Sequence, residues 1–156
     1  MPGNVGQHPA TEAQLFDAIG GVRCSVGRLN LRQGTVSAQA VKVDTCSVRV
    51  QGCDVQITGA EVALTVTTHD IAANNEAVFL LLLNPTSGAL TIVKGTTVAG
   101  AGAAVDPATI AANLVAVGRF RIRTTVTFTA NTTSLSAAGV TVTFEDRAQP
   151  LNYAAQ

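Results

Sequence analysis

Apolar and polar residues alternate with a period of two along much of the first half of the chain, between residues 22 and 68. This is the pattern of strands that bury one face. Glycines separate the runs, and turn signals about every 8 to 12 residues are typical of an all-β sandwich or barrel. The similar pieces at residues 48–52 and 55–59 predict two strands around a tight turn, because two copies are too few for a repeat array. The alternating apolar positions are Val22, Cys24, Val26, Val41, Val43, Val48, Val50, Val55, Ile57, Val62, Leu64 and Val66.

The second half of the chain predicts a buried hairpin. Residues 78–83 are all apolar, which indicates a strand covered on both faces. A turn signal follows at Asn84-Pro85, and residues 89–94 return as the partner strand. One or two more strands are expected within residues 115–129 and a last one at residues 140–144. The predicted fold class is therefore all-β, an antiparallel β-sandwich or β-barrel with a few short helical additions.

The start of the chain is predicted to be a polar arm followed by a short helix. Thr11 and Gln14 have the spacing of a capping box, and the glycine pair from Gly20 supplies a stop. This helix would dock on a partner, with packing on the β-domain of its own chain as the alternative. Its apolar stripe consists of Leu15, Phe16 and Ile19.

A further short helical segment is expected in the loop that precedes the last strands. Asp106 is a good N-cap residue, and Pro107 fits the first helical position. Ile110 and Leu114 would form the buried face of this segment.

The composition changes this picture in one respect, the covering of the surface. The 156 residues carry 10 Lys+Arg and 10 Asp+Glu, and only 13% are charged, against about 25% in an ordinary soluble domain. A neutral chain lacks the basic excess that binding to nucleic acid requires, and a hydrophobic content of 47% argues against global disorder. The surface must therefore be covered by small uncharged residues or by another protein.

We divide the chain into an arm with the short helix at residues 1–21, a β-rich domain at residues 22–146 and a polar tail at residues 147–156. The longest apolar run, residues 77–83, is far shorter than the roughly 20 residues of a membrane span. The first residues lack the basic and apolar regions of a secretory signal. We therefore expect a soluble cytosolic product that has no membrane partner.

Three cysteines, Cys24, Cys46 and Cys53, are spread over the first half of the chain. Their spacing fits no usual zinc site, so we expect no metal or other cofactor. We interpret them as small buried hydrophobic residues, with an inter-strand or inter-subunit disulfide as the alternative.

Three arginines alternate with two apolar residues in the segment Arg119-Phe120-Arg121-Ile122-Arg123. In a strand the arginines would share one face, about 7 Å apart, and the two apolar residues would share the other. Guanidinium groups so close together need acceptors. One interpretation is a solvated face near the acidic residues 145–146. The other is a contact stripe for carboxylates of a partner, for which the bidentate guanidinium is well suited.

The sequence offers little for catalysis, and we do not expect an enzyme. It lacks the GxxxxGK[ST] phosphate-binding loop. His69 and Asp70 are adjacent and resemble a base with its orienting group, but no Ser or Cys nucleophile motif accompanies them. The remaining carboxylates of this region are scattered rather than clustered as in a calcium loop, and we expect solvated turn residues at Asp44, Asp54 and Glu61.

A longer pattern covers residues 68–146. A hairpin, AVFLLLLNPTSGALTIVKGT, leads through a Gly/Ala loop to DPATIAANLVAVGRFRI and then to VTFTANTTSLSAAGVTVTFED. This order resembles small virion structural proteins of tailed bacteriophages, of the kind found as capsid decoration (cement) proteins or other head and tail accessories. The resemblance implies an oligomer, a trimer, that binds the major capsid protein on the outside of the assembled shell and stabilises it mechanically.

The leading hypothesis is thus a decoration protein on the capsid surface of the virion. The alternative is a tail- or fibre-associated module that contacts a host receptor or glycan. With no Trp and one Tyr, the aromatic surface that sugar binding uses is poorly supplied. The expected contact residues of the decoration protein are Arg119, Arg121, Arg123, Leu15, Phe16 and Ile19.

Overall fold

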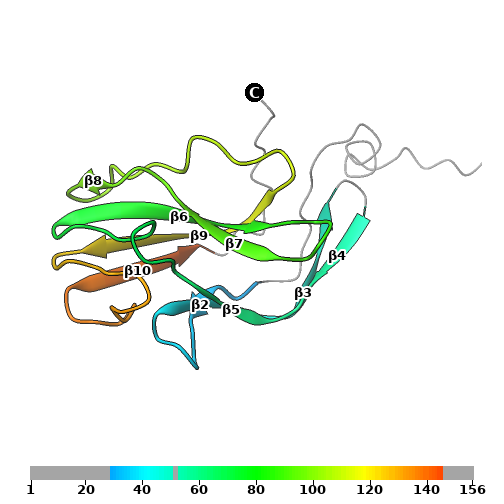
Figure 1. Ribbon diagram of the computed structural model, residues 1–156, viewed down its shortest axis with the longest axis horizontal. Coiled ribbons are helices and arrows are strands. Elements are labelled where there is room, and N and C mark those ends of the chain that lie inside the picture. The colour runs from blue at the N-terminus through cyan, green and yellow to red at the C-terminus, as the bar shows by residue number, and fades with distance from the viewer. Residues whose placement is uncertain (1–28, 51–52, 146–156) are drawn as a thin grey trace, which may run out of the picture.

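A computed structural model of the chain describes residues 29–50 and 53–145, which form ten β-strands joined by loops (Figure 1). All strand pairs are antiparallel, which confirms the predicted all-β class. None of the described residues forms a helix that is long and apolar enough to cross a membrane. The strands are β1 (Arg32–Gln33), β2 (Ala40–Val43), β3 (Cys46–Val50), β4 (Cys53–Ile57), β5 (Ala60–Ala63), β6 (Asn75–Leu83), β7 (Leu90–Lys94), β8 (Val98–Ala99), β9 (Val115–Thr124) and β10 (Val140–Glu145).

The larger layer is a five-stranded sheet with the order β10-β9-β6-β7, in which β8 also pairs with β6. Strand β6 lies inside this sheet, and every residue from Ala77 to Leu83 is fully buried. The predicted strand with two covered faces is therefore confirmed. So is the predicted hairpin, because β7 returns beside β6 with Leu90 opposite Leu83. The Asn84 side chain fixes the turn by accepting the amide of Thr86 at 2.9 Å.

The smaller layer is one long hairpin with an extra strand at its side. Strands β1, β2 and β5 form a three-stranded sheet, and β3 and β4 pair separately. The two pairings share one register: Val43 lies opposite Ala60. Cys46, further along, lies opposite Ile57. The predicted pairing of two strands across residues 51–52 is thus confirmed.

The main core lies between the inner faces of these two layers. Phe79 and Phe120 stack there with ring centroids 5.0 Å apart. Strand β9 bulges beside β6, so that Leu81 faces Gly118 and Leu82 faces Ala116. The fully buried large side chains of this core are Val41, Ile57, Leu64, Ile71, Phe79, Leu81, Leu83, Phe120, Ile122 and Phe128.

A loop covers the outer face of the five-stranded sheet, where a helical segment was predicted. Residues 106–114 are irregular, so that prediction was wrong. Asp106 does not cap a helix because its carboxylate binds Arg119 on the sheet. Ile110 and Leu114 still pack inward, as expected, against a small cluster around Leu80 and its neighbours. Covering a wide sheet face favours an extended path over the local preference for a helix.

The stacked phenylalanine pair gives the first test of this core. Replacing Phe79 with Ala removes a fully buried ring and leaves a cavity between the layers, which should lower the free energy of unfolding by about 3–5 kcal/mol. The same truncation at Val36, which is 93% exposed, is the control and should change little. Urea unfolding followed by circular dichroism measures both, and equal effects of the two substitutions would contradict this packing.

Candidate functional site: the arginine face and an open groove

The predicted division of the β9 arginine segment between two faces is confirmed. Phe120 and Ile122 are fully buried in the main core. The three arginines project from the opposite, outer face, but their exposures differ. Arg119 is 8% exposed, Arg121 is half-buried and Arg123 is exposed. The stripe is therefore not uniform.

Arg119 is held by two carboxylates from opposite sides. Its Nε donates to Asp106 Oδ1 at 2.6 Å, in the loop that covers the sheet. Its Nη1 donates to Glu145 Oε1 at 2.5 Å, on the neighbouring strand β10. Arg119 thus ties the covering loop and the last strand to β9, and its charge is balanced within the chain. The expected proximity of the acidic end of β10 is confirmed at Glu145.

Arg121 shares a buried carboxylate with the glycine-rich loop. Glu76, 2% exposed, lies 3.5 Å from Arg121 Nη1. The same carboxylate accepts the amide of Gly102 at 3.2 Å. The Arg121 Nε is buried without a hydrogen-bond partner. The side chains of this stripe that reach the surface are therefore those of Arg121 and Arg123.

His69 is buried and both of its ring nitrogens are occupied. Nδ1 accepts the amide of Thr65 at 2.8 Å, and Nε2 lies 3.1 Å from the carbonyl of Ile92, to which it donates as the Nε2–H tautomer. The ring also meets the edge of Phe79 at 5.8 Å. Burial lowers the pKa of His69, and the nearby charge of Lys94 acts in the same direction. This neutral imidazole links residues 65–69 to the edge of β7 by hydrogen bonds.

Asp70 does not orient His69, because its two oxygens accept backbone amides. Oδ1 binds the amide of Ala130 at 2.7 Å and Oδ2 that of Thr67 at 3.1 Å. His69 and Asp70 are adjacent in the sequence, but each binds different parts of the fold and they do not act as a pair. Within residues 29–50 and 53–145, no three His, Cys, Asp or Glu side chains gather in a way that could hold a metal ion.

Glu61 and Asp44 are not merely solvated turn residues, as the sequence suggested. The Glu61 carboxylate accepts the amides of Val36 and Ser37, each at 2.8 Å, and that of Thr35 at 2.6 Å. These hydrogen bonds, of which that from Val36 has the largest effect, lower the pKa of Glu61 to about 2. The pKa of Asp44 is also lowered to about 2, chiefly by its hydrogen bond from Arg32. Both carboxylates fix the loops at the two ends of β2.

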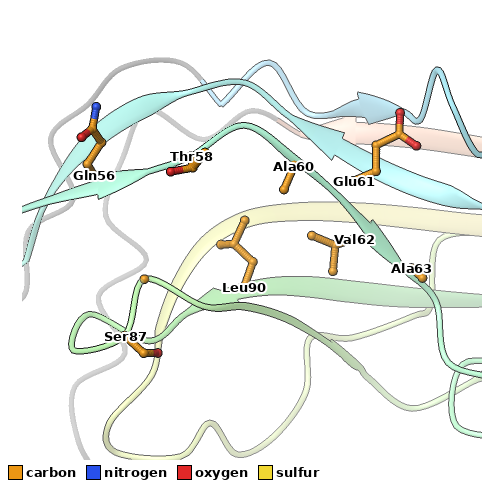
Figure 2. A pocket seen from close by; sticks show the side chains of 9 residues that line it. Gln56, Thr58, Ala60, Glu61, Val62, Ala63, Ser87 and Leu90 are labelled. Carbon is orange, nitrogen blue, oxygen red and sulfur yellow. The ribbon is translucent and has the colours of Figure 1, made fainter.

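An open groove separates the edges of the two layers on one side of the molecule (Figure 2). Strand β5 pairs with β2, and β7 pairs with β6, so that each of them leaves one edge without a partner strand in the described part of the chain. Ala60 and Val62 point from β5 toward β7, and Leu90 points back between them (Figure 2). The groove has a volume of about 500 Å³, and its further lining residues are Gln56, Thr58, Glu61, Ala63, Ser87 and Gly88.

The groove exists because only part of this side is closed. The hydrogen bond from His69 to Ile92 holds residues 64–71 against β7. Leu64 and Ile71 are fully buried in this part. Beyond Ile92, toward the β6–β7 turn, Leu90 is half-buried and Ala60 is exposed. The opposite side is covered further, by the loop after β9, whose Leu135 donates its amide to Ala38 at 2.9 Å. Alternation in the sequence could not reveal this gap, because Val62 reads as an ordinary core position.

Several predicted residues fall outside the described part of the chain. These include the arm and its helix at residues 1–21, with the apolar stripe Leu15, Phe16 and Ile19, as well as Cys24. Cys46 is half-buried and packs against the main core. It lies opposite Ile57 rather than Cys53, so these two cysteines are not cross-strand neighbours.

Comparison with known proteins adds no family to this description. No family model matches the chain, and neither a curated protein nor a solved structure matches it.

The two ends of the arginine stripe should respond very differently to truncation. Arg119→Ala leaves the carboxylates of Asp106 and Glu145 without their shared partner, and we expect a loss of about 3 kcal/mol in the free energy of unfolding. Arg123→Ala, on the same face of the same strand but exposed, should cost less than about 0.5 kcal/mol. Chemical denaturation of both variants decides the point; similar losses would show that Arg119 is not a structural tie.

His69 should make stability depend on pH between about pH 7.5 and 5.5. Because its pKa is lowered in the folded protein, the unfolded chain takes up a proton near pH 6.5 that the folded chain resists. The free energy of unfolding should therefore fall as the pH drops below about 6.5, by at most about 1.4 kcal/mol per pH unit.

Denaturation curves across that interval measure this slope. Asp44 and Glu61, whose pKa values lie at about 2, stay ionised and do not contribute. His69→Gln should flatten the slope and His8→Gln should retain it. A wild-type curve that is flat in this range would contradict the role of His69.

Proposed function

We propose that this protein is a non-enzymatic structural protein of a tailed-phage virion, which binds the outside of the capsid and stabilises it. The observation that carries the proposal is the set of unpaired strand edges in a neutral, low-charge β-domain. Strands β5, β7 and β10 each have one edge without a partner strand among the described residues. Such edges are sites of pairing between chains, and in a lone protein they are normally blunted or covered. The resemblance of residues 68–146 to decoration proteins suggests the partner, the major capsid protein.

The use of the buried ionisable groups supports a scaffold rather than a catalyst. Arg119 joins a loop to two strands, Glu76 holds the glycine-rich loop, and His69 fastens residues 65–69 to β7. Each of these groups binds neighbours in the fold. In an active site we would instead expect such groups to converge on a cleft.

The part of the outer face of the large sheet that the loop leaves uncovered, along β9 and β10, is the surface that we assign to the capsid. Arg121 and Arg123 reach this surface beside the exposed threonines of β10, Thr141 and Thr143. Arginine is favoured at protein interfaces, where its planar group can bind a carboxylate through two hydrogen bonds. We expect the matching acidic residues on the major capsid protein. Self-association, as a trimer in the proposal, would cover the strand edges.

Co-sedimentation with empty shells of the major capsid protein from the same virus tests the proposal. We expect saturable binding to the shells and a higher temperature of shell disassembly. Arg123→Glu should weaken binding by on the order of tenfold, because it replaces an attraction with a repulsion. Lys42→Glu, a charge reversal on the other layer, is the matched control and should bind like the wild type.

Two outcomes would overturn the proposal. One is a folded protein that stays in the supernatant at every shell concentration. The other is binding to purified tails or to host cells with none to shells, which would favour the tail-associated module instead. Equal binding of Arg123→Glu and Lys42→Glu would remove the arginine face from the interface.

A further inference from the structure

We propose that the groove between β5 and β7 receives the C-terminal segment, residues 147–156, of a second copy of this chain. The inference deepens the self-association in the proposed function and rests on it. The groove and the segment are complementary in chemistry. The segment follows β10, and the groove is lined by β7, which is the opposite edge of the five-stranded sheet.

The groove is built to take an extended chain. Ala60, Val62 and Leu90 present apolar side chains to its interior (Figure 2). The free edge of β5 supplies backbone groups along one wall, where an added strand can pair. Its volume of about 500 Å³ lies within the roughly 300–1,000 Å³ of pockets that hold ligands of the size of a few side chains.

The groove has no charged side chain that is available to bind a charged group of a partner. Its charged lining residue is Glu61, and that carboxylate is occupied by the amides of residues 35–37. The rim is polar but uncharged, with Gln56, Thr58 and Ser87. A matching segment would therefore be uncharged, with one or two large apolar side chains and a polar group that reaches the rim.

The segment 147–156 has these properties. After Arg147 it carries no charged side chain, and Leu151 and Tyr153 alternate around Asn152. In an extended strand Leu151 and Tyr153 share one face. A buried tyrosine combines a large apolar ring with a hydroxyl that needs a partner, and the uncharged polar rim provides such partners. Tyrosine is also among the residues favoured at interfaces.

The topology favours a second copy over the same chain. The segment follows Glu145 at the end of β10, and β10 and β7 are opposite edges of the five-stranded sheet. Crossing that sheet spans three strand spacings, about 14 Å. The groove also lies about 10 Å further along the strands, because Glu145 shares the register of Val93 and Leu90 is three residues away from Val93. The residues from Glu145 to Leu151 reach about 20 Å at full extension, which is too short for a path around the covered faces of the sheet. A contact that leaves by one side and enters by the other is head-to-tail. Such contacts form a ring, as a trimer requires, when the rotation between copies closes, and an open filament when it does not.

Tyr153 provides its own probe, because the chain has one Tyr and no Trp. We would measure acrylamide quenching of tyrosine fluorescence in the full-length protein over a dilution series, with light scattering at each concentration. We expect Tyr153 to be shielded in the oligomer and to become fully quenchable on dilution to single chains. Quenching that is complete in the oligomer, or shielding that persists in single chains, would overturn the inference.

Matched variants identify the groove and the segment. Ala60→Arg fills the groove from an exposed position, and Leu151→Ser removes the apolar anchor while it keeps the probe. Each should expose Tyr153 and weaken self-association by on the order of tenfold or more. Val36→Arg, at a position that is 93% exposed elsewhere, should change neither. An Ala60→Arg protein that keeps both its oligomer and a shielded Tyr153 would contradict this docking.

These results are separable from a failure of the capsid proposal. An oligomer that binds shells with Tyr153 exposed would refute the docking and leave the capsid role intact. Shielding of Tyr153 in an oligomer that ignores shells would support the docking and refute the capsid role.

Discussion

Strand β6 imposes the constraint on which the rest of the structure depends. Its residues from Ala77 to Leu83 are all buried, and a strand with two apolar faces must be covered twice. The inner face is covered by the β2–β5 hairpin and its neighbours through Phe79 and the main core. The outer face is covered by residues that are not a strand or a helix, the loop around Ile110 and Leu114. The burial of apolar surface on both sides of β6 is the main source of stability, because each Å² removed from water contributes roughly 25 cal/mol.

The loop that covers the outer face of β6 explains where many of the few charged residues of the protein are used. A loop with small residues buries little apolar surface, so it needs polar attachments to stay on the sheet. Arg119 binds the loop through Asp106, and Glu76 binds it through the amide of Gly102. Because these groups are largely buried, their hydrogen bonds and ion pairs are stronger than the same contacts in water. Much of the scarce charge in the chain thus holds the fold, and a smaller part, at Arg121 and Arg123, reaches the surface.

The all-β class, the β6–β7 hairpin and the two faces of β9 were predictable from the sequence, because they follow from local alternation. The path of residues 106–114 was not, because the carboxylate of Asp106 binds a residue that is distant in sequence and not the amides of the next turn. The tasks of His69, Glu61 and Asp44 were also hidden. Those of His69 and Glu61 depend on backbone groups of another segment, and that of Asp44 depends on the side chains of Arg32 and Asn30. The groove depends on where one layer ends over the other, which the pattern within each strand does not encode.

The central claim is that the strand edges of this domain are surfaces for assembly. Hydrogen–deuterium exchange of the backbone amides, compared between dilute protein and protein assembled on shells, tests it directly. The account predicts slower exchange in assembled protein at β5, β7 and β10, while the amides of β6 are protected in both states. Unchanged exchange at all three edge strands in protein that is bound to shells would contradict it.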